Sequence, residues 1–463
     1  MYKQGSEAIG PTEAAASGAG APLPPASRAP ALVQTLAMLR DPVGYLERRR
    51  RRLGPVFSAR ILSMCRLVYV AEPELAREIY RTDRGTSRAG EVREDFLAPL
   101  VGSHSLLTLD GEQWLRHRKL LGPAMHGARI ERYRDEIAAI AAAEIERWPL
   151  GEPLELRPRM QAITLEVILR LVFGIADAQR LERMHRLLPP LLEGPQWFVL
   201  WLLPRPARDR LLRSAVLARI VPRNPLTRFR AGVRELDAIL YEEIARRRAS
   251  GVADGHDMLS VMLATGEGEG EPLSDEELRD ELVTLLFAGH ETTATALAWA
   301  FERLVRSPSA LGRLEVELRN GSETYLDAVA KETLRARPVV IDTPRLLDEP
   351  LRLDGYEVPA GWYVAPAVPL VQRATSRYRD PDTFRPERFL GPDPPVDAWI
   401  PFGGGKRRCI GSHLALLELK TVIAEVLGPL RVEAAAPAPE RQMVRHVTLV
   451  PEHGSRVVAH PRN

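Results

Sequence analysis

The sequence predicts a mainly α-helical protein with small β-sheets, an α+β fold class. Three observations support this class. Apolar residues recur at helical spacing over residues 130–148, 156–173 and 229–248. Two short runs near the start, Val56–Ile61 and Arg66–Val70, have the composition of strands. After residue 340 the pattern changes to short strands and Pro-rich turns.

Length and composition predict one large domain. The chain has 463 residues, 45% of them hydrophobic, and no obvious linker interrupts it. Residues 1–35 are rich in Ala, Gly, Pro and Ser and lack the apolar core of a signal peptide, so we expect a flexible tail followed by a single domain over 36–463. No segment reaches the roughly 18 apolar residues that a membrane span needs, which predicts no membrane anchor.

Charge and cysteine usage exclude several classes. A formal net charge of +3 gives no case for nucleic-acid binding. Two cysteines in different settings do not form a disulfide framework, which fits a reducing cytoplasm. We expect Cys65, after a strand-like run, to be a structural thiol. The basic run Arg48–Arg52 is typical of a solvated helix end, and a phosphate or anionic-lipid patch is the alternative.

The elements of the first half follow from local breakers. Leu53–Phe57 contains Gly-Pro, which ends a first helix and opens the strand pair. Residues Pro73–Tyr80 then predict a helix, since proline is favoured in a first helical turn. Residues 186–224 are rich in Leu, Trp, Pro and Arg.

A long helix is predicted from Ser274 onward. Ser274 and Glu277 form a capping box, and the helical pattern continues to Arg306, where Ser307-Pro308 stops it. About thirty residues at ~1.5 Å each span ~45 Å, enough to cross a domain. Apolar residues surround its middle, so the helix should be buried.

The middle of this helix carries an unusual segment, Ala288–Thr293, with the sequence Ala-Gly-His-Glu-Thr-Thr. A glycine costs ~1 kcal/mol relative to alanine inside a helix, and threonine hydroxyls can bond back to carbonyls one turn earlier. Such locally unfavourable residues tend to mark function. A helix-surface acid and a satisfied core hydroxyl are the alternative interpretation.

Cys409 lies in a glycine-rich loop, Phe402–Gly411, just before an apolar helical run. A thiolate needs positive surroundings and backbone N–H donors, which basic residues and a helix N-terminus supply. Glycines let the backbone turn sharply and approach a flat ring. The segment predicts a loop that holds one thiolate against a large planar cofactor, and a buried cysteine in a turn is the alternative.

The pattern Phe402-x-x-Gly405-x-Arg407-x-Cys409-x-Gly411 resembles the haem-ligand loop of the cytochrome P450 monooxygenases. The resemblance covers residues 40–460 and implies the cytochrome P450 fold, with haem b between the long central helix and the helix of the cysteine loop. It implies a bacterial-type, cytoplasmic enzyme. Cys409 would be the iron ligand, and a thiolate on haem iron favours O–O cleavage.

The resemblance extends to the long helix, whose segment is similar to the family's oxygen-activation motif. It implies that Ala288 faces the haem and that Gly289 leaves space for dioxygen. Thr292 would hydrogen-bond the iron-bound peroxide, and Glu291 would help relay protons. His290 stands at a variable position and is expected to be structural.

Two further motifs match the family. The residues that would contact the haem and its propionates are Trp114, Arg118, Arg345, Phe402, Arg407 and Gly411. The residues of a buried charge network that would hold the fold around the cysteine loop are Glu332, Arg335 and Arg388. Gln372 departs from the histidine often found at its position, with little expected consequence.

The function implied is insertion of one oxygen atom of O2 into a C–H bond. Electrons would come from a ferredoxin with a separate NAD(P)H reductase, because no Gly-x-Gly-x-x-Gly follows a strand. Lys406 and Arg408 would suit an acidic ferredoxin. We expect a monomer.

The substrate should be lipophilic, such as a fatty acid, terpenoid or steroid, because the expected distal wall is apolar. The candidate residues of that wall are Ser105, Leu106, Phe287, Ala288, Val339, Val340 and Val447. The segment 197–203 is either an apolar lid, ordinary core or a membrane contact.

Three other functions stay open: a peroxide-using enzyme, a non-oxidative haem-thiolate enzyme, and a haem-binding carrier or sensor without turnover. Glu291 and Thr292 argue against each, since none of them needs an acid–alcohol pair.

Overall fold

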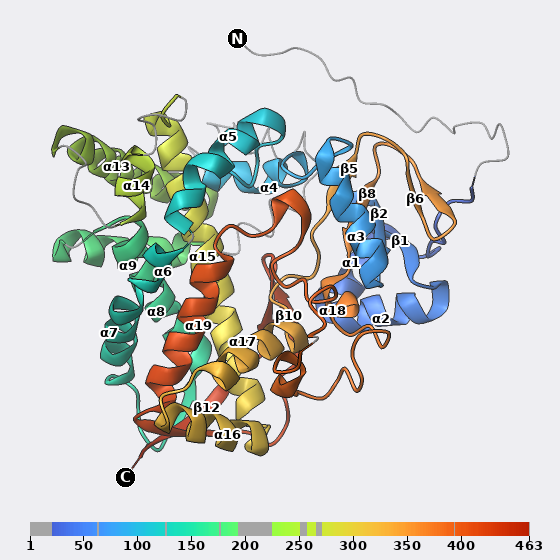
Figure 1. The fold of residues 1–463 in the computed structure, drawn as a ribbon. Coiled ribbons are helices and arrows are strands. Elements are labelled where there is room, and N and C mark those ends of the chain that lie inside the picture. Colours follow the sequence, from blue (N-terminus) through green and yellow to red (C-terminus); the bar gives the residue numbers. More distant parts are fainter. Residues whose placement is uncertain are drawn as a thin grey trace.

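A computed structural model describes residues 21–62, 64–125, 127–175, 177–192, 225–250, 257–264, 271–392 and 394–462. Helices make up most of the molecule, and the largest sheet lies to one side beside the first three helices (Figure 1). The segment 197–203, which we considered as a lid, lies outside the described residues, as does the side chain of Cys65.

The first three helices lie beside the largest sheet, and the following helices of the first half belong to the mainly helical part of the molecule (Figure 1). The helices of the first half are α1 (Ala31–Arg40), α2 (Pro42–Leu53), α3 (Pro73–Arg81), α4 (Glu91–Val101), α5 (Gly111–Leu121), α6 (Ala128–Glu131), α7 (Arg134–Ile145), α8 (Leu156–Val167) and α9 (Ala178–Leu192). Short 3-10 or π turns are η1 (Thr82–Arg84), η2 (Gly122–Met125) and η3 (Ile168–Val172).

The helices of the second half surround one long helix. They are α13 (Pro225–Ser250), α14 (Met258–Ala264), α15 (Asp275–Leu304), α16 (Pro308–Arg319), α17 (Thr324–Ala336), α18 (Val368–Val371) and α19 (Ser412–Leu427). The 3-10 turns η4 (Pro386–Phe389) and η5 (Gly405–Arg407) precede α19.

The largest sheet has five strands in the order β1-β2-β8-β5-β3. Its strands are β1 (Val56–Ile61), β2 (Met64–Val70), β3 (Ser87–Arg88), β5 (Arg345–Leu347) and β8 (Tyr363–Pro366). Only β2 and β8 pair in parallel, and Leu67 faces Tyr363 across that pair. The sheet therefore joins the start of the chain to the region after residue 340.

Three smaller sheets complete the β structure of the described residues. They pair β6 (Leu351–Leu353) with β7 (Tyr356–Val358), β10 (Gln442–Arg445) with β11 (Thr448–Pro451), and β12 (Arg456–Pro461) with both β4 (Pro153–Glu155) and β9 (Leu430–Ala434). The β10–β11 hairpin also reaches the segment after α17, because Val340 bridges Thr448.

Most predicted elements occur where the sequence placed them, with three differences. The predicted helix over 130–148 is divided into α6 and α7, and the one over 156–173 ends in the π turn η3. The expected tail 1–35 is packed against the fold in its described part. There the amide of Ser58 donates to the carbonyl of Pro25, and Gln34 is buried.

The helix α15 has the predicted start. Ser274 accepts a hydrogen bond from the amide of Glu277, whose side chain accepts one from the amide of Ser274, so the capping box is complete. The body of α15 packs against α8 and α19 within the main hydrophobic cluster (Figure 1). The packing of α15 against these two helices therefore fixes the positions of its middle residues.

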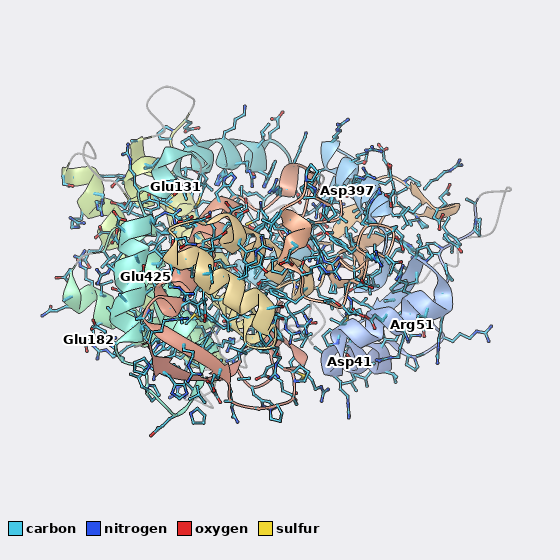
Figure 2. The ribbon with its side chains drawn as sticks, turned by 60° about the horizontal axis from the view of Figure 1, so that its bottom comes forward. Asp41, Arg51, Glu131, Glu182, Asp397 and Glu425 are labelled. Atoms are coloured by element: carbon cyan, nitrogen blue, oxygen red, sulfur yellow. The ribbon has the colours of Figure 1, made fainter. Side chains whose placement is uncertain are left out.

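The surface carries charges of both signs. Figure 2 shows this distribution around the ribbon, with labelled examples at Asp41, Arg51, Glu131, Glu182, Asp397 and Glu425. In the described part of the chain no helix is both long and apolar enough to cross a membrane.

Candidate active site

The cysteine loop is a compact turn ahead of α19. The amide of Cys409 donates to the carbonyl of Phe402 at 2.9 Å, which closes the loop on itself. Gly403 and Gly405 have φ values of 68° and 67°, in the left-handed region that other residues rarely adopt. The loop thus needs glycine at these two positions to bring Cys409 to the end of η5.

The close packing of the cysteine loop against the end of α3 and against η1 also requires glycine at two positions. A Cβ atom on Gly404 would lie 2.4 Å from the ring of Tyr80, and one on Gly405 would lie 2.4 Å from a carboxylate oxygen of Asp83. Real Cβ atoms do not approach neighbours so closely. The cysteine loop therefore packs directly against Tyr80 of α3 and Asp83 of η1, and these two residues position it.

Cys409 is accessible to solvent, and the surrounding protein still desolvates its thiol. Burial raises the pKa of the Cys409 thiol, while the amide of Gly411 and the guanidinium groups of Arg118 and Arg408 act in the opposite direction. The sequence analysis expected basic residues and backbone N–H donors to favour the thiolate. In the protein chain alone desolvation is the larger effect, so coordination to a metal is what would hold the thiolate.

The middle of α15 contains an accessible stretch within an otherwise buried helix. Phe287, Ala288, Gly289, Glu291 and Thr292 are all partly exposed, whereas most residues of the helix on either side are buried. The hydroxyl of Thr292 donates to the carbonyl of Ala288 at 2.5 Å, one turn earlier. The segment that the sequence singled out therefore borders open space inside the molecule.

The structure accounts for Gly289 by helix packing. A Cβ atom there would lie 3.0 Å from Cδ1 of Ile168, on the π turn that follows α8. The sequence analysis attributed this glycine to space for dioxygen, and the packing of η3 against α15 also favours a small residue, because a Cβ atom would have to displace the end of the Ile168 side chain.

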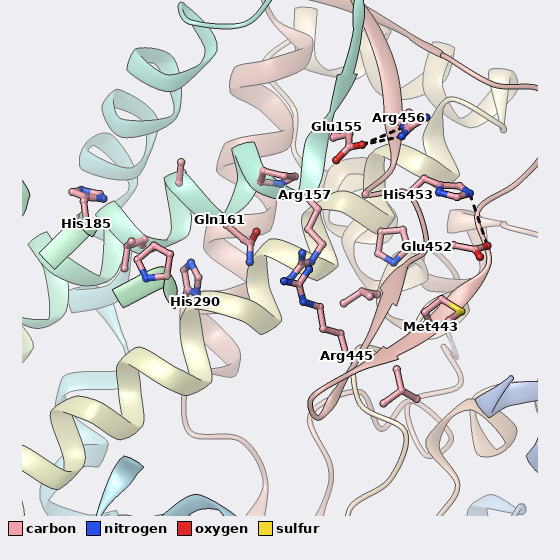
Figure 3. Close-up of a pocket in the computed structure, with 18 residues that line it drawn as sticks. Glu155, Arg157, Gln161, His185, His290, Met443, Arg445, Glu452, His453 and Arg456 are labelled. Atoms are coloured by element: carbon pink, nitrogen blue, oxygen red, sulfur yellow. Dashed lines mark hydrogen bonds and ion pairs between the residues drawn. The ribbon is translucent and has the colours of Figure 1, made fainter. Parts of the chain in front are cut away.

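Glu291 is held by partners from two other elements. Its Oε1 lies 2.5 Å from Nη2 of Arg157, and its Oε2 accepts a hydrogen bond from Nε2 of Gln161 at 2.8 Å. The hydroxyl of Thr448, on β11, lies 3.5 Å from Oε1. Arg157 and Gln161 come from α8 (Figure 3). The sequence motif gave no indication of these partners, because they are more than a hundred residues away.

His290 is a structural residue, as expected. It is 2% exposed, and its carbonyl accepts a hydrogen bond from the hydroxyl of Thr164 at 2.9 Å. Burial lowers the pKa of His290 to about 4, so the ring is neutral at pH 7.

Trp114 is buried between two predicted arginines. The guanidinium carbons of Arg407 and Arg118 lie 4.3 and 6.0 Å from the centroid of its ring. Arg407 donates to the carbonyl of Leu109 at 2.7 Å and pairs with Asp110. Arg118 donates to the carbonyl of Arg408 at 2.8 Å. Helix α5 thus places Trp114 and Arg118 against the cysteine loop.

Arg345, on β5 of the largest sheet, belongs to the same cluster of arginines as Arg118 and Arg407. It is 1% exposed and makes a bidentate ion pair with Asp83, with distances of 2.6 and 3.2 Å. Arg93, on α4, was missed by the sequence analysis. Its charge interacts with those of Arg345 and Arg407. A single arginine on a short helix carries no motif, so the sequence offered no way to identify it.

This arginine cluster fits a cofactor that carries anionic groups. Burial and neighbouring positive charges lower the pKa of Arg93 to about 9 and that of Arg407 to about 10. Gathering guanidinium groups in an interior is unfavourable unless anions compensate them. Asp83 and Asp110 pair with Arg345 and Arg407, the two propionates of a haem would provide anions for the remaining guanidinium groups, and Cys409 would provide a thiolate for the iron. The residues present therefore fit a haem.

The predicted charge network joins the end of α17, which carries Glu332 and Arg335, to Arg388 on η4. Arg335 and Glu332 are both 0% exposed and form a bidentate pair at 2.7 and 2.8 Å. Nε of Arg388 lies 3.5 Å from Glu332, too poorly aligned for a hydrogen bond, and its other nitrogens donate to the carbonyls of Arg379 and Asp380. Arg388 thus contributes charge to the network and fastens the following loop.

Gln372 has a larger role than the sequence analysis expected. Its side chain is buried and donates to the carbonyl of Leu334 at 2.8 Å, while its Oε1 accepts from the amide of Ile400 at 3.0 Å. It therefore links the end of α17 to the residues just before Phe402.

The candidate substrate wall is only partly assembled as expected. Ser105 is 0% exposed and its hydroxyl accepts a hydrogen bond from Thr284 at 2.6 Å, so it belongs to the core and the expectation for it is wrong. Leu106 and Val339 are 8% exposed, and Val340 is partly exposed. Val447 is 39% exposed in the turn of the β10–β11 hairpin.

Comparisons with known proteins agree with this geometry. A family profile described as Cytochrome P450 matches residues 23–457. The protein named "Putative cytochrome P450 135B1" from Mycobacterium tuberculosis is 38% identical over 443 residues, which are 94% of this chain and 91% of that protein. "Putative cytochrome P450 138" from Mycobacterium bovis is 36% identical over 446 residues, 95% of this chain and 97% of that protein.

A solved structure has the same fold. "Retinoic acid bound cyanobacterial CYP120A1" superposes with a TM-score of 0.80 at 25% sequence identity, covering 96% of this chain and 100% of that one. The predicted fold and enzyme class are confirmed. The chain belongs to the cytochrome P450 family, and is a haem-thiolate monooxygenase.

Proposed function

We propose that this enzyme binds haem b and inserts one oxygen atom of O2 into a C–H bond of a lipophilic small molecule, such as a fatty acid, terpenoid or steroid. Electrons come from a ferredoxin with a separate NAD(P)H reductase. Residues 36–463 act as one haem domain.

The haem-binding residues follow from the arrangement of the cluster. Haem supplies the iron chemistry that splits dioxygen and transfers one oxygen atom. Cys409 would hold the iron, and Phe402 and Gly411, at the two ends of the loop, would contact the ring. Trp114 and the arginines bind the propionates, since planar guanidinium groups match carboxylates in two-point contacts. These arginines are Arg93, Arg118, Arg345 and Arg407.

Proton delivery is assigned to the acid and the alcohol of α15. Thr292 holds its proton against the carbonyl of Ala288 at the accessible middle of the helix. Glu291 is the next residue along and is bound to side chains of α8 that border solvent. A proton from solvent can therefore reach the carboxylate of Glu291 and then the hydroxyl of Thr292.

The lipophilic substrate is supported by the apolar residues near this helix. Leu106, Phe287, Val339 and Val340 carry no charge or hydrogen-bonding side chain, so they offer only dispersion and desolvation to a bound molecule. The solved relative binds retinoic acid, which is largely hydrocarbon. Ala288, the small residue beside the haem, would leave room for such a substrate.

The ferredoxin donor is supported by a groove on the cysteine-loop side of the molecule. The groove has a volume of about 900 Å³ and is lined in part by Gly403, Gly404 and Gly405. Its described basic residues are Arg77, Arg81, Arg84, Lys331, Lys406 and Arg408, whereas Asp397 is its one described acid. Such an excess of positive charge attracts an acidic protein.

The observation that carries the proposal is an accessible cysteine beside a cluster of arginines, in a fold whose central helix is partly exposed in its middle, at Phe287–Gly289 and at Glu291 and Thr292. The test is turnover under 18O2 with ferredoxin, reductase and NADPH, using lipophilic compounds that shift the haem spin state. We expect a product that carries one labelled oxygen. An unlabelled product, or turnover by peroxide alone at the same rate, would contradict the proposal.

A further inference from the structure

A second cavity lies on the side of α15 that faces α8. Its volume is about 730 Å³, and it is bordered by α8, α9, the middle of α15 and the β10–β11 hairpin (Figure 3). Neither Cys409, Ala288 nor Thr292 is among the described residues that line it. The cavity is therefore distinct from the haem site.

Two polar groups in the wall of this cavity lack partners. Nε of Arg157 and Nδ1 of His290 have no hydrogen-bond partner among the described residues. Arg157 is 5% exposed and His290 2% exposed, so both side chains are deeply buried. An unmet buried donor on a guanidinium group is costly, because it has lost its water without gaining an acceptor. Nε of Arg157 thus needs a hydrogen-bond acceptor, whereas Nδ1 of the neutral His290 ring is a donor or an acceptor according to its tautomer.

The charge of the lining favours an anion. The described lining residues include three arginines and two glutamates, and His290 is neutral at pH 7. Both glutamates have basic neighbours, since Glu155 accepts from Arg456 at 3.0 Å and Glu452 lies 3.8 Å from Arg441. Figure 3 shows the side chains of Arg157 and Arg445 extending into the cavity from opposite walls. Two guanidinium groups that converge in this way suit a carboxylate.

The rest of the lining is apolar. Pro158 and Leu165 come from α8, Pro189 from α9, and Met443 and Val450 from the hairpin. An occupant with a short hydrocarbon body would cover these residues, whereas an inorganic ion would leave them in contact with water.

We propose that this cavity is a binding site for a small organic carboxylate, held between Arg157 and Arg445 with its hydrocarbon part against the apolar wall. The occupant competes with Glu291 for Arg157, because that guanidinium group already pairs with Glu291 at 2.5 Å. The site goes beyond the proposed reaction, and its binding can be measured without turnover.

The competition makes a specific prediction for Glu291→Gln. This substitution removes the negative charge of Glu291, which now pairs with Arg157. The guanidinium group of Arg157 then pairs with the added carboxylate without competition. We expect hexanoate to bind the haem-loaded variant about fivefold or more tightly than the unmodified protein. A pocket that merely accepted the hydrocarbon chain would show no such gain.

The experiment is a calorimetric titration of the haem-loaded protein with hexanoate at constant ionic strength. Arg445→Gln should weaken binding by about fivefold or more, and Ala162→Phe, which fills the cavity without changing its charge, should abolish it. Arg431→Gln, an exposed arginine on β9, is the matched control and should leave affinity within about twofold. The carbon monoxide spectrum of each variant verifies that it is folded.

Two comparisons locate the bound molecule. Hexanamide, which has the same length without the charge, should bind about tenfold more weakly. The Soret band should not move, because the ligand does not reach the haem. Absence of saturable binding, equal affinity in Arg445→Gln and Arg431→Gln, or binding that shifts the Soret band would each overturn the proposal.

Discussion

At the scale of single residues, Thr292 is the clearest example of a side chain whose local chemistry is unusual. Its hydroxyl bonds back to the carbonyl of Ala288, in the partly exposed middle of a helix that is otherwise mostly buried. Back-bonding of this kind slightly destabilises a helix. The residue therefore lowers helix stability at the place where α15 opens to internal space.

Thr292→Ala should separate electron use from product formation. Without the hydroxyl, protons reach the bound oxygen less reliably, so product per electron should fall and hydrogen peroxide should rise. The measurement is product and peroxide per NADPH consumed. Thr292→Ser keeps the hydroxyl and is the control. A peroxide-using enzyme, a non-oxidative enzyme or a carrier would show no difference between the two variants.

Glu418 is a buried carboxylate that the mechanism does not use. It is 3% exposed on α19, and burial raises its pKa from 4.5 to about 8. Between these two values the folded protein keeps a proton that the unfolded chain has already lost. The free energy of unfolding therefore falls as pH rises through this range, and the effect of Glu418 is complete above pH 8.

Glu418→Gln should remove this pH dependence. We expect the melting temperature of the variant to match that of the unmodified protein near pH 5 and to exceed it near pH 8. Thermal unfolding at both pH values is the measurement. Glu182→Gln, an exposed carboxylate on α9, is the control. An equal or lower melting temperature for Glu418→Gln at pH 8 would show that Glu418 is ionised in the folded state.

Residue roles were predictable from sequence only where a motif marked them. The cysteine loop and the segment of α15 stand out because their glycines, threonines and cysteine are unusual locally. Arg93, Arg157 and Gln372 were missed because their partners are far away in the chain. Ser105 was wrongly placed in the substrate wall. It is buried and accepts a hydrogen bond from Thr284, a residue that is far away in the chain.

At the scale of elements, α17 and the loop after it form one unit through the Glu332–Arg335 pair. Arg335 also donates to the carbonyls of Gln372 and Pro381, and the amide of Arg385 donates to Glu332 at 2.7 Å. A helix is thereby joined to three separate parts of the chain before the cysteine loop. This arrangement makes the loop position depend on a buried ion pair.

Glu332→Gln should destabilise the protein strongly. Removing one member of a buried pair leaves the other charge uncompensated, which costs about 3–5 kcal/mol. Asp327→Asn, on the same helix, is the control, because its surface pair with Lys331 is worth about 0–1 kcal/mol. Urea unfolding followed by haem absorbance and by fluorescence compares the two. Equal losses would mean that the buried pair does not hold this region together.

Element boundaries were predictable wherever a breaker residue is present. The strand β1 and the start of α15 follow from Gly54-Pro55 and from the capping box at Ser274. The division between α6 and α7 and the π turn at Ile168–Val172 could not be predicted, because the apolar spacing continues through both. At the π turn, Ile168 packs close to Gly289 of α15, a contact between elements that the local sequence does not reveal.

At the scale of the whole molecule, the net charge of +3 conceals an uneven distribution. Six basic residues line the groove beside the cysteine loop, among them Lys406, Arg408 and Arg84, against one described acid. Sequence alone indicated only Lys406 and Arg408, because the arginines of α3 join them through folding. A local positive field raises the association rate of an acidic partner.

Lys406→Glu should slow reduction by a ferredoxin. Reversing an exposed charge at an interface mainly lowers the association rate, by about tenfold at low salt, and the effect should shrink at high salt. Stopped-flow reduction of the haem at two ionic strengths is the measurement. Arg51→Glu, an exposed arginine on α2, is the control. An unchanged rate for Lys406→Glu would place the docking surface elsewhere.

The central claim is that Cys409 would hold the iron of a bound haem as a thiolate. The dithionite-reduced carbon monoxide difference spectrum of the purified protein tests it most directly. We predict a Soret band at the long wavelength that is specific to thiolate-ligated haem, lost in Cys409→Ser. A band at the shorter wavelength of histidine- or thiol-ligated haem, or no haem band in folded protein supplied with haem, would contradict the account.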